Sequence, residues 1–260
     1  MSVRRAIKKT IEYAQNFGSH INIDEIKKRL ISKKIYSESL LENEILKLSW
    51  QNKKNKWKKI KVIKAKKLAF LIKNKFSDIL FLGISGSVAS GHPKKEDDID
   101  ILVITKSYTL WKNRFFLRWW IFKNRIPHRS FGGVEVKDQF CFNLWLDEHH
   151  LKIPKERQNL RNAMDLILLK PLINKNYTYE KFILENKWVK RYVATGYSKK
   201  VSDLPAGQAS ARYQMSDKTK TKKKILNQIS NCLYFWPQYW YMKPKITKEK
   251  IGLHWAFFHK

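Results

Sequence analysis

The sequence is poor in cysteine, and it contains no long apolar run. Its two cysteines, Cys141 and Cys232, lie far apart and without metal-ligand spacing, which argues against a disulfide-stabilised secreted fold and favours a reducing compartment. No stretch of about 20 apolar residues occurs, which excludes a transmembrane helix. Residues 1–17 lack the apolar centre of a signal peptide. We therefore expect a soluble, cytoplasmic protein.

Acidic residues are also scarce. The chain of 260 residues has 22 Asp and Glu against 54 Lys and Arg, which gives a formal net charge of +32. Such a charge attracts polyanions, including nucleic acid and anionic membrane surfaces. Only 11 of the 54 basic residues are arginine, the better bidentate reader of phosphates and bases. The balance predicts general affinity for polyanions, but it does not by itself predict a specific nucleic-acid site.

Two short apolar runs stand out in the middle of the chain. Residues 79–84 are apolar throughout, which is typical of a strand buried on both faces. Residues 98–104 form a second run, in which Asp98 and Asp100 alternate with isoleucine. Because successive side chains alternate across a strand, we expect Asp98 and Asp100 on one face and Ile99, Ile101 and Val103 on the other.

The turn between these runs begins with the small residues Ser85, Gly86 and Ser87. Two carboxylates at the mouth of a buried strand repel each other and are costly unless a cation lies between them. Oxygen ligands suit Mg²⁺, which often shares its coordination shell with substrate phosphates. A Gly-Ser turn at a helix N-terminus offers N–H groups and a hydroxyl to the same phosphates. The two segments together predict a site for Mg²⁺ and a nucleoside triphosphate (NTP).

Gly86-Ser87, a gap of ten residues, and Asp98-Ile99-Asp100 resemble the Gly-Ser…Asp-x-Asp signature of the nucleotidyltransferase superfamily, which has the polymerase-beta-like fold. The resemblance covers residues 78–146 and is to the small bacterial members. It implies transfer of a nucleoside monophosphate from a Mg²⁺-bound NTP, expected to be ATP, to a protein, an RNA or a small molecule. It assigns Asp98 and Asp100 to metal binding and catalysis, and Ser85, Gly86 and Ser87 to the nucleotide phosphates.

The predicted third strand departs from the pattern of this family. In the family it usually carries a third carboxylate, which completes a second metal position and can accept the proton of the attacking hydroxyl. Residues 140–146 are interpreted as this strand, and Asn143 stands where the carboxylate is expected. An amide oxygen can ligate a cation, but an amide cannot act as a general base. Glu135, Asp138 and Asp147 are the alternatives if the register is shifted.

Two other functions stay open. Asn143 is compatible with a nucleotide-binding or antitoxin-like regulator that keeps the pocket but performs no transfer. The basic composition is compatible with a nucleic-acid-binding protein that uses residues 1–68, with the lysine-rich segment 52–68 as its first candidate contact, although a charge run is usually a solvated face. His149 and His150 are interpreted as surface residues, because adjacent side chains diverge.

The two ends of the chain have helical patterns. Apolar spacing predicts three short N-terminal helices, in which Phe17 continues the apolar face of the first helix. They resemble a helix-turn-helix or a truncated winged helix, and the alternative is a small helical cap packed on the next domain. The third helix exposes acidic residues and is a poor reader of DNA. An aromatic-rich helix over residues 111–125 is expected to cross the sheet between the second and third strands, and a closing helix is expected to be interrupted at Pro237.

We therefore expect an α/β (α+β) fold, with a polymerase-beta-like mixed sheet and flanking helices. The predicted divisions are residues 1–50, helical and helix-turn-helix-like; 51–77, a basic helix or linker; 78–150, the nucleotidyltransferase core; and 151–260, a helical C-terminal region with a flexible loop near 203–212.

Overall fold

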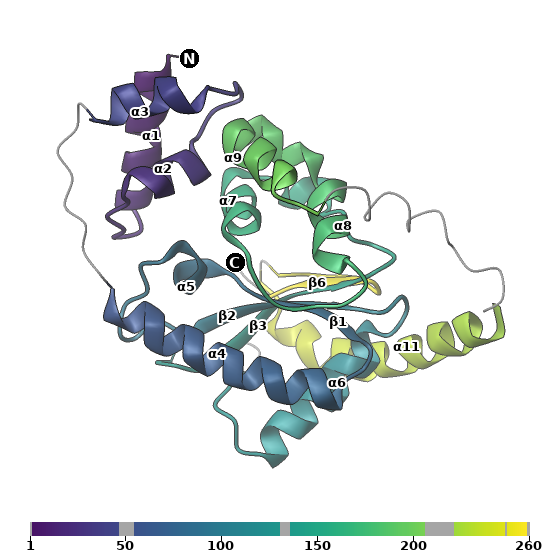
Figure 1. The fold of residues 1–260 in the computed structure, drawn as a ribbon. Helices are drawn as coiled ribbons and strands as arrows, with labels where there is room; N and C mark the ends of the chain where they lie inside the picture. Colours follow the sequence, from purple (N-terminus) through teal and green to yellow (C-terminus); the bar gives the residue numbers. More distant parts are fainter. Residues whose placement is uncertain (1, 47–54, 131–135, 206–220, 248, 259–260) are drawn as a thin grey trace.

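A six-stranded mixed sheet lies at the centre of the protein (Figure 1). The computed structural model describes residues 2–46, 55–130, 136–205, 221–247 and 249–258. The strand order is β4-β1-β2-β3-β6-β5, and neighbours are antiparallel except for the parallel pair β2 and β3. The strands are β1 (Ile79–Ile84), β2 (Ile99–Thr105), β3 (Phe140–Asp147), β4 (Lys170–Asn174), β5 (Lys250–Ile251) and β6 (Trp255–Phe257).

Helices cover both faces of this sheet (Figure 1). The α-helices of the described residues are α1 (Val3–Gln15), α2 (Ile23–Arg29), α3 (Glu38–Leu46), α4 (Lys56–Lys75), α5 (Gly86–Ser90), α6 (Leu110–Lys123), α7 (Leu160–Leu168), α8 (Thr178–Glu185), α9 (Lys190–Ser202) and α11 (Thr221–Met242). α4, α6 and α11 pack on one face, and α7, α8 and α9 pack on the other. A parallel pair of strands needs a crossover connection, and α6 supplies it between β2 and β3 as the sequence predicts.

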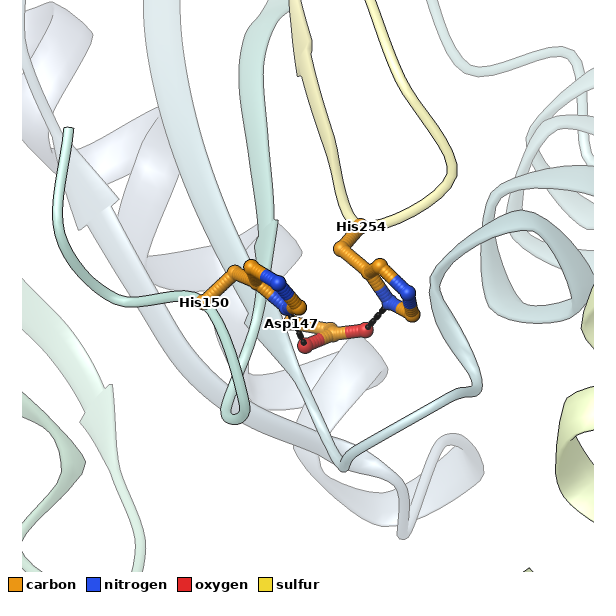
Figure 2. Close-up of side chains that lie close together, drawn as sticks. All are labelled: Asp147, His150 and His254. Atoms are coloured by element: carbon orange, nitrogen blue, oxygen red, sulfur yellow. Dashed lines mark hydrogen bonds and ion pairs between the residues drawn. The ribbon is translucent and has the colours of Figure 1, made fainter. Parts of the chain in front are cut away.

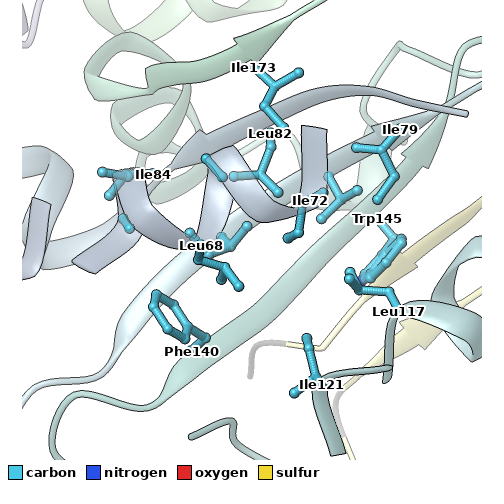
Figure 3. Close-up of a cluster of buried hydrophobic side chains, with 14 of the residues drawn as sticks. Leu68, Ile72, Ile79, Leu82, Ile84, Leu117, Ile121, Phe140, Trp145 and Ile173 are labelled. Atoms are coloured by element: carbon cyan, nitrogen blue, oxygen red, sulfur yellow. The ribbon is translucent and has the colours of Figure 1, made fainter. Parts of the chain in front are cut away.

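The alternation of side chains in β2 decides what each face of the sheet receives. Ile99, Ile101 and Val103 enter the core under α4 and α6, part of which is drawn in Figure 3. Leu102 and Ile104 enter the second core, beneath α7, α8 and α9. Asp98 and Asp100 precede Leu102 at even spacing, and they line a cavity together with residues of α7. The predicted separation of Asp98 and Asp100 from Ile99, Ile101 and Val103 onto opposite faces is confirmed.

The region 151–260, expected to be helical, is helical only in part, because β4, β5 and β6 all join the sheet. β4 contains Pro171, which is tolerated because β4 is an edge strand that needs few ladder hydrogen bonds. β5 and β6 are too short to show an alternating pattern. α11 continues through Pro237, where an interruption was expected, and ends before the 3-10 turn Lys243–Lys245. Most of the predicted loop near 203–212 lies outside the described residues.

Of the three N-terminal helices, α2 packs against α7 and α9, and α1 and α3 pack on α2 (Figure 1). The backbones meet at Gly196 of α9, where a Cβ atom would lie 2.0 Å from the carbonyl oxygen of Lys28. The Ala194 amide also donates to the Ser32 carbonyl at 2.8 Å. Only glycine permits this contact between the backbones of α2 and α9. The helices are therefore packed on the rest of the protein, although the predicted boundary between residues 1–50 and 51–77 falls outside the described part of the chain.

Candidate functional site

Asp98 and Asp100 lie at the start of β2, and both side chains are buried. One carboxylate oxygen of each and the Cys141 sulfur of β3 lie within 4.8 Å of one another. Register explains the third member, since Asp100 pairs with Cys141 across the parallel strands. The structure thus brings together the two aspartates singled out from the sequence, at a separation that a single cation can span.

Gly86 packs directly against this pair. Its φ is +62°, and a Cβ atom at this position would lie 2.1 Å from Asp100 Oδ2. The Ser85 amide donates to the Asp100 carbonyl at 3.0 Å, which ties the end of β1 to β2. The glycine therefore has two physical reasons to be there, a left-handed backbone conformation and close approach to a carboxylate. The helix that follows, α5, has only five residues, so it adds little dipole to the site.

Asn143 adopts the predicted position beside the aspartates. The pairing of β2 with β3 shifts between Ile101 and Leu102, opposite Phe142 and Leu144, so Asn143 lies at a bulge. Its Nδ2 donates to Asp100 Oδ1 at 2.8 Å. Within the described parts of the chain, its buried Oδ1 has no hydrogen-bond partner. A buried oxygen without a partner is costly, and a cation beside Asp100 would satisfy it.

The other carboxylates considered for this position point elsewhere. Asp138 binds Lys61 and Lys64, each at 2.8 Å. Asp147 lies at the far end of β3, where it contacts His254. Glu135 lies outside the described residues. A shifted register therefore does not bring Asp138 or Asp147 to the aspartate pair.

Two neighbours set the electrostatics of the aspartate pair. Arg129, in the segment between α6 and β3, places Nη1 3.2 Å from Asp98 Oδ2. Burial raises the pKa of the Cys141 thiol, and the charges of Asp100 and Asp98 raise it further. The thiol is therefore protonated at neutral pH, and it is a weaker candidate metal ligand than the carboxylates.

A cavity of about 480 Å³ opens in front of the aspartates. Gly86, Ser87, Asp98 and Asp100 line it, together with side chains that sequence reasoning missed. Those from the N-terminal segment and α7 are Tyr13 of α1, Phe17 in the turn after α1, Arg29 of α2, and Arg161 and Asp165 of α7. Phe17, expected on a buried helix face, is 56% exposed and lines this cavity instead. The volume lies within the range of about 300–1,000 Å³ typical of small-molecule sites.

Ser85 is separated from the other members of its turn. It lines a smaller cavity of about 80 Å³ together with Asn143, whereas Gly86 and Ser87 line the larger one. Arg161 and Asp165 line both cavities, so α7 forms a wall common to the two. Only long-range packing places α7 here, and nothing in the local pattern of residues 160–168 signals it.

The lysine-rich segment 52–68 is partly a structural element. Its first three residues lie outside the described part, and the rest begins α4. Lys61 is fully buried and donates to the carbonyls of Lys95 and Asp97, at 3.2 and 2.6 Å, and to Asp138. The description of this segment as a solvated face is wrong for Lys61, which fixes the loop immediately before Asp98.

No helix in the described part of the chain is long and apolar enough to cross a membrane. No protein-family model, curated protein or solved structure matches this chain. The geometry of the site is therefore the basis for a proposal of its function.

Proposed function

We propose that this chain is a metal-dependent nucleotidyltransferase of the polymerase-beta-like fold. The observation that carries the proposal is the packing of Gly86 against Asp100 at a cavity that Ser87 and Asp98 also line. The order of elements supports it. A strand leads into a glycine-serine turn, an antiparallel strand carries the two aspartates, and a helix crosses over to a parallel third strand.

The donor atoms around the aspartates fit Mg²⁺. Asp98 and Asp100 offer hard carboxylate oxygens, and Asn143 offers an amide oxygen that lacks a partner within the described residues. Few fixed protein ligands suit this ion, because it keeps positions for water and substrate phosphates. When bound, Mg²⁺ would neutralise charge on the triphosphate. The cluster of two acids and a protonated thiol suits it better than a soft metal.

The remaining polar residues of the cavity would bind the triphosphate or orient the aspartates. The Ser87 hydroxyl and the backbone N–H groups of the turn would bind phosphate oxygens. Lys94 and Arg161, which also line the cavity, would contribute positive charge toward the triphosphate. Arg129 would hold the Asp98 carboxylate in place. This division gives each polar element of the cavity a role in binding or orientation.

The transfer itself needs a proton acceptor, and Asn143 cannot serve as one. We assign this role to Asp165 of α7, a carboxylate that lines the cavity from outside the sheet. The acceptor hydroxyl oxygen attacks the α-phosphorus while its proton passes to Asp165. The bond from the α-phosphorus to the bridging oxygen breaks, and pyrophosphate leaves. The acceptor is a hydroxyl group of a protein, an RNA or a small molecule.

Calorimetry and pyrophosphate release test the proposal together. We expect Asp98→Asn and Asp100→Asn each to weaken Mg–ATP binding at least about tenfold, since each removes a charged ligand. Asp78→Asn is the matched control. It makes the same change in charge at the other end of β1, where Asp78 is paired with Lys106. Unchanged Mg–ATP affinity in both site variants would show that the metal and nucleotide assignment is wrong.

Asn143 favours one alternative, a regulator that binds the nucleotide without transferring it. Mg–ATP binding without pyrophosphate release, across protein, RNA and small-molecule acceptors, would support that alternative. Asn143→Asp supplies the missing carboxylate beside Asp100. If the chain is a weakened enzyme, this variant should release pyrophosphate faster than the wild type, and it should be less stable without metal because three buried carboxylates then lie together.

A further inference from the structure

A second group of metal-ligating side chains lies at the opposite end of β3. Asp147, His150 and His254 place one donor atom each within 4.8 Å of the others (Figure 2). His254 Nδ1 lies 2.6 Å from Asp147 Oδ2, and His150 Nδ1 lies 3.7 Å from Asp147 Oδ1. The two imidazole rings stack with their centroids 4.2 Å apart. Asp147 is four residues beyond Asn143, about 13 Å along the strand, so this group is separate from the aspartate pair.

The carboxylate of Asp147 is held in place by backbone donors. It is fully buried, and its Oδ1 accepts the His149 amide at 2.9 Å. Its Oδ2 accepts the Tyr108 amide at 3.3 Å. Such outer contacts fix the direction of a ligand and are typical of built metal sites.

The loop that carries His254 is equally well fixed. The Asp147 amide donates to the His254 carbonyl at 3.0 Å. The Trp111 indole and the Asn231 amide both donate to the Leu253 carbonyl, each at 3.1 Å. The histidine thus projects from a short turn between β5 and β6 that α6 and α11 support.

Hydrogen bonding explains His254 but does not explain His150. The Asp147–His254 contact is a complete hydrogen bond, whereas 3.7 Å is too long for one from His150. His150 is 43% exposed, yet its Nδ1 is directed at a buried carboxylate and its ring lies flat on the other imidazole. A cation held by both Nδ1 atoms would lie in the plane of each ring, so on binding the exposed His150 ring would turn out of the stack while its Nδ1 stays beside Asp147, and His254 Nδ1 would exchange its hydrogen bond for the metal.

We propose that Asp147, His150 and His254 form a binding site for Zn²⁺. Two imidazole nitrogens and one carboxylate oxygen are a common zinc donor set, and the exposed side of His150 leaves a fourth position for water. Bound there, the ion would join the end of β3 to the β5–β6 turn. The site would stabilise the attachment of the C-terminal strands to the sheet, independently of any nucleotide chemistry.

Titration of the EDTA-treated, dialysed protein with ZnCl₂ in a calorimeter tests this proposal. We expect one tight site in the wild type, at least about tenfold weaker in His150→Gln and in His254→Gln. His149→Gln is the matched control. It removes a neighbouring exposed histidine outside the ligand set, and it should leave the affinity unchanged. His150→Gln decides the case if His254→Gln fails to fold, because His150 makes only the long contact to Asp147.

Co²⁺ spectroscopy identifies the ligands independently. A spectrum without a thiolate charge-transfer band supports the histidine site, whereas such a band, lost in Cys141→Ser, would place the metal at the aspartate pair and overturn the proposal. Absence of Zn²⁺ binding, equal affinity in wild type and His150→Gln, or an equal loss in His149→Gln would also overturn it. Zn²⁺ should raise the melting temperature of the wild type but not that of His150→Gln.

Discussion

Gly86→Ala is the sharpest perturbation of the candidate nucleotide site. Two costs are visible in the structure. The backbone φ of +62° strains an alanine by about 1–2 kcal/mol. The new Cβ atom would lie 2.1 Å from Asp100 Oδ2, so the carboxylate must retreat by about 1 Å to reach an ordinary contact. That retreat weakens the bond from Asn143 to Asp100, worth about 1 kcal/mol.

We therefore expect Gly86→Ala to lose about 2–3 kcal/mol of unfolding free energy and about 100-fold in Mg–ATP affinity, since a misplacement of about 1 Å in a preorganised site has effects of that size. Urea denaturation measures the first quantity, and isothermal titration calorimetry measures the second.

Gly91→Ala separates backbone strain from damage to the site. Gly91 has a φ of +97°, so alanine there is strained as well. Its new Cβ atom would meet only the ends of flexible side chains, Glu25 Oε1 at 3.0 Å and Lys58 Nζ at 3.2 Å. This variant should lose stability but keep its Mg–ATP affinity. If both variants lose similar stability and both bind Mg–ATP like the wild type, the role given to Asp100 is refuted.

Three further predictions concern two lysines and the proposed proton acceptor. Lys61→Met should lower the unfolding free energy, measured by urea denaturation, by about 3 kcal/mol, because it leaves buried acceptors unpaired. Lys64→Met is the control. The Lys64 side chain is 43% exposed, so its loss should cost less than about 1 kcal/mol. Burial lowers the pKa of Lys200 to about 8. Between pH 8 and 9.5 the unfolded chain therefore binds more protons than the folded chain. The unfolding free energy, measured by urea denaturation, should rise by about 1–2 kcal/mol over this range because of this residue. Lys170 has the same lowered pKa of about 8, so Lys200→Met should keep about half of the combined rise, and an unchanged slope would contradict the assignment. Asp165→Asn should slow pyrophosphate release while Mg–ATP affinity, measured by calorimetry, stays near that of the wild type; equal rates would exclude it as the proton acceptor.

Local pattern was sufficient for the centre of the fold. The apolar run of β1 and the alternation in β2 follow from burial on two faces, and both could be read directly from residues 79–84 and 98–104. The pairing of Asp98 with Asp100 followed from the same alternation. The position of Asn143 beside Asp100 also agreed with expectation, although the bulge that directs it there left no sequence signal.

Longer-range features could not be predicted in this way. β6 has only three residues, too few for a sequence pattern, and it is a strand because it pairs with β3. Asp165 lies on an ordinary amphipathic helix and Phe17 in the turn after α1, and only tertiary packing brings them to the cavity. His254 lies 107 positions from Asp147 in the sequence, so the contact between them could not be predicted from the neighbours of either residue.

The contact at Gly196 reaches beyond packing. Because the backbones of α9 and α2 are in direct contact there, no flexible side chain lies between them that could adjust to a change at this position. The N-terminal segment to which α2 belongs contributes Tyr13 and Phe17 to the wall around the aspartates. A ligand bound in this cavity would contact both the N-terminal segment and the strand that carries the aspartates. Gly196→Ala, which displaces α2 from α9, should therefore lower the affinity for that ligand although position 196 is outside the cavity.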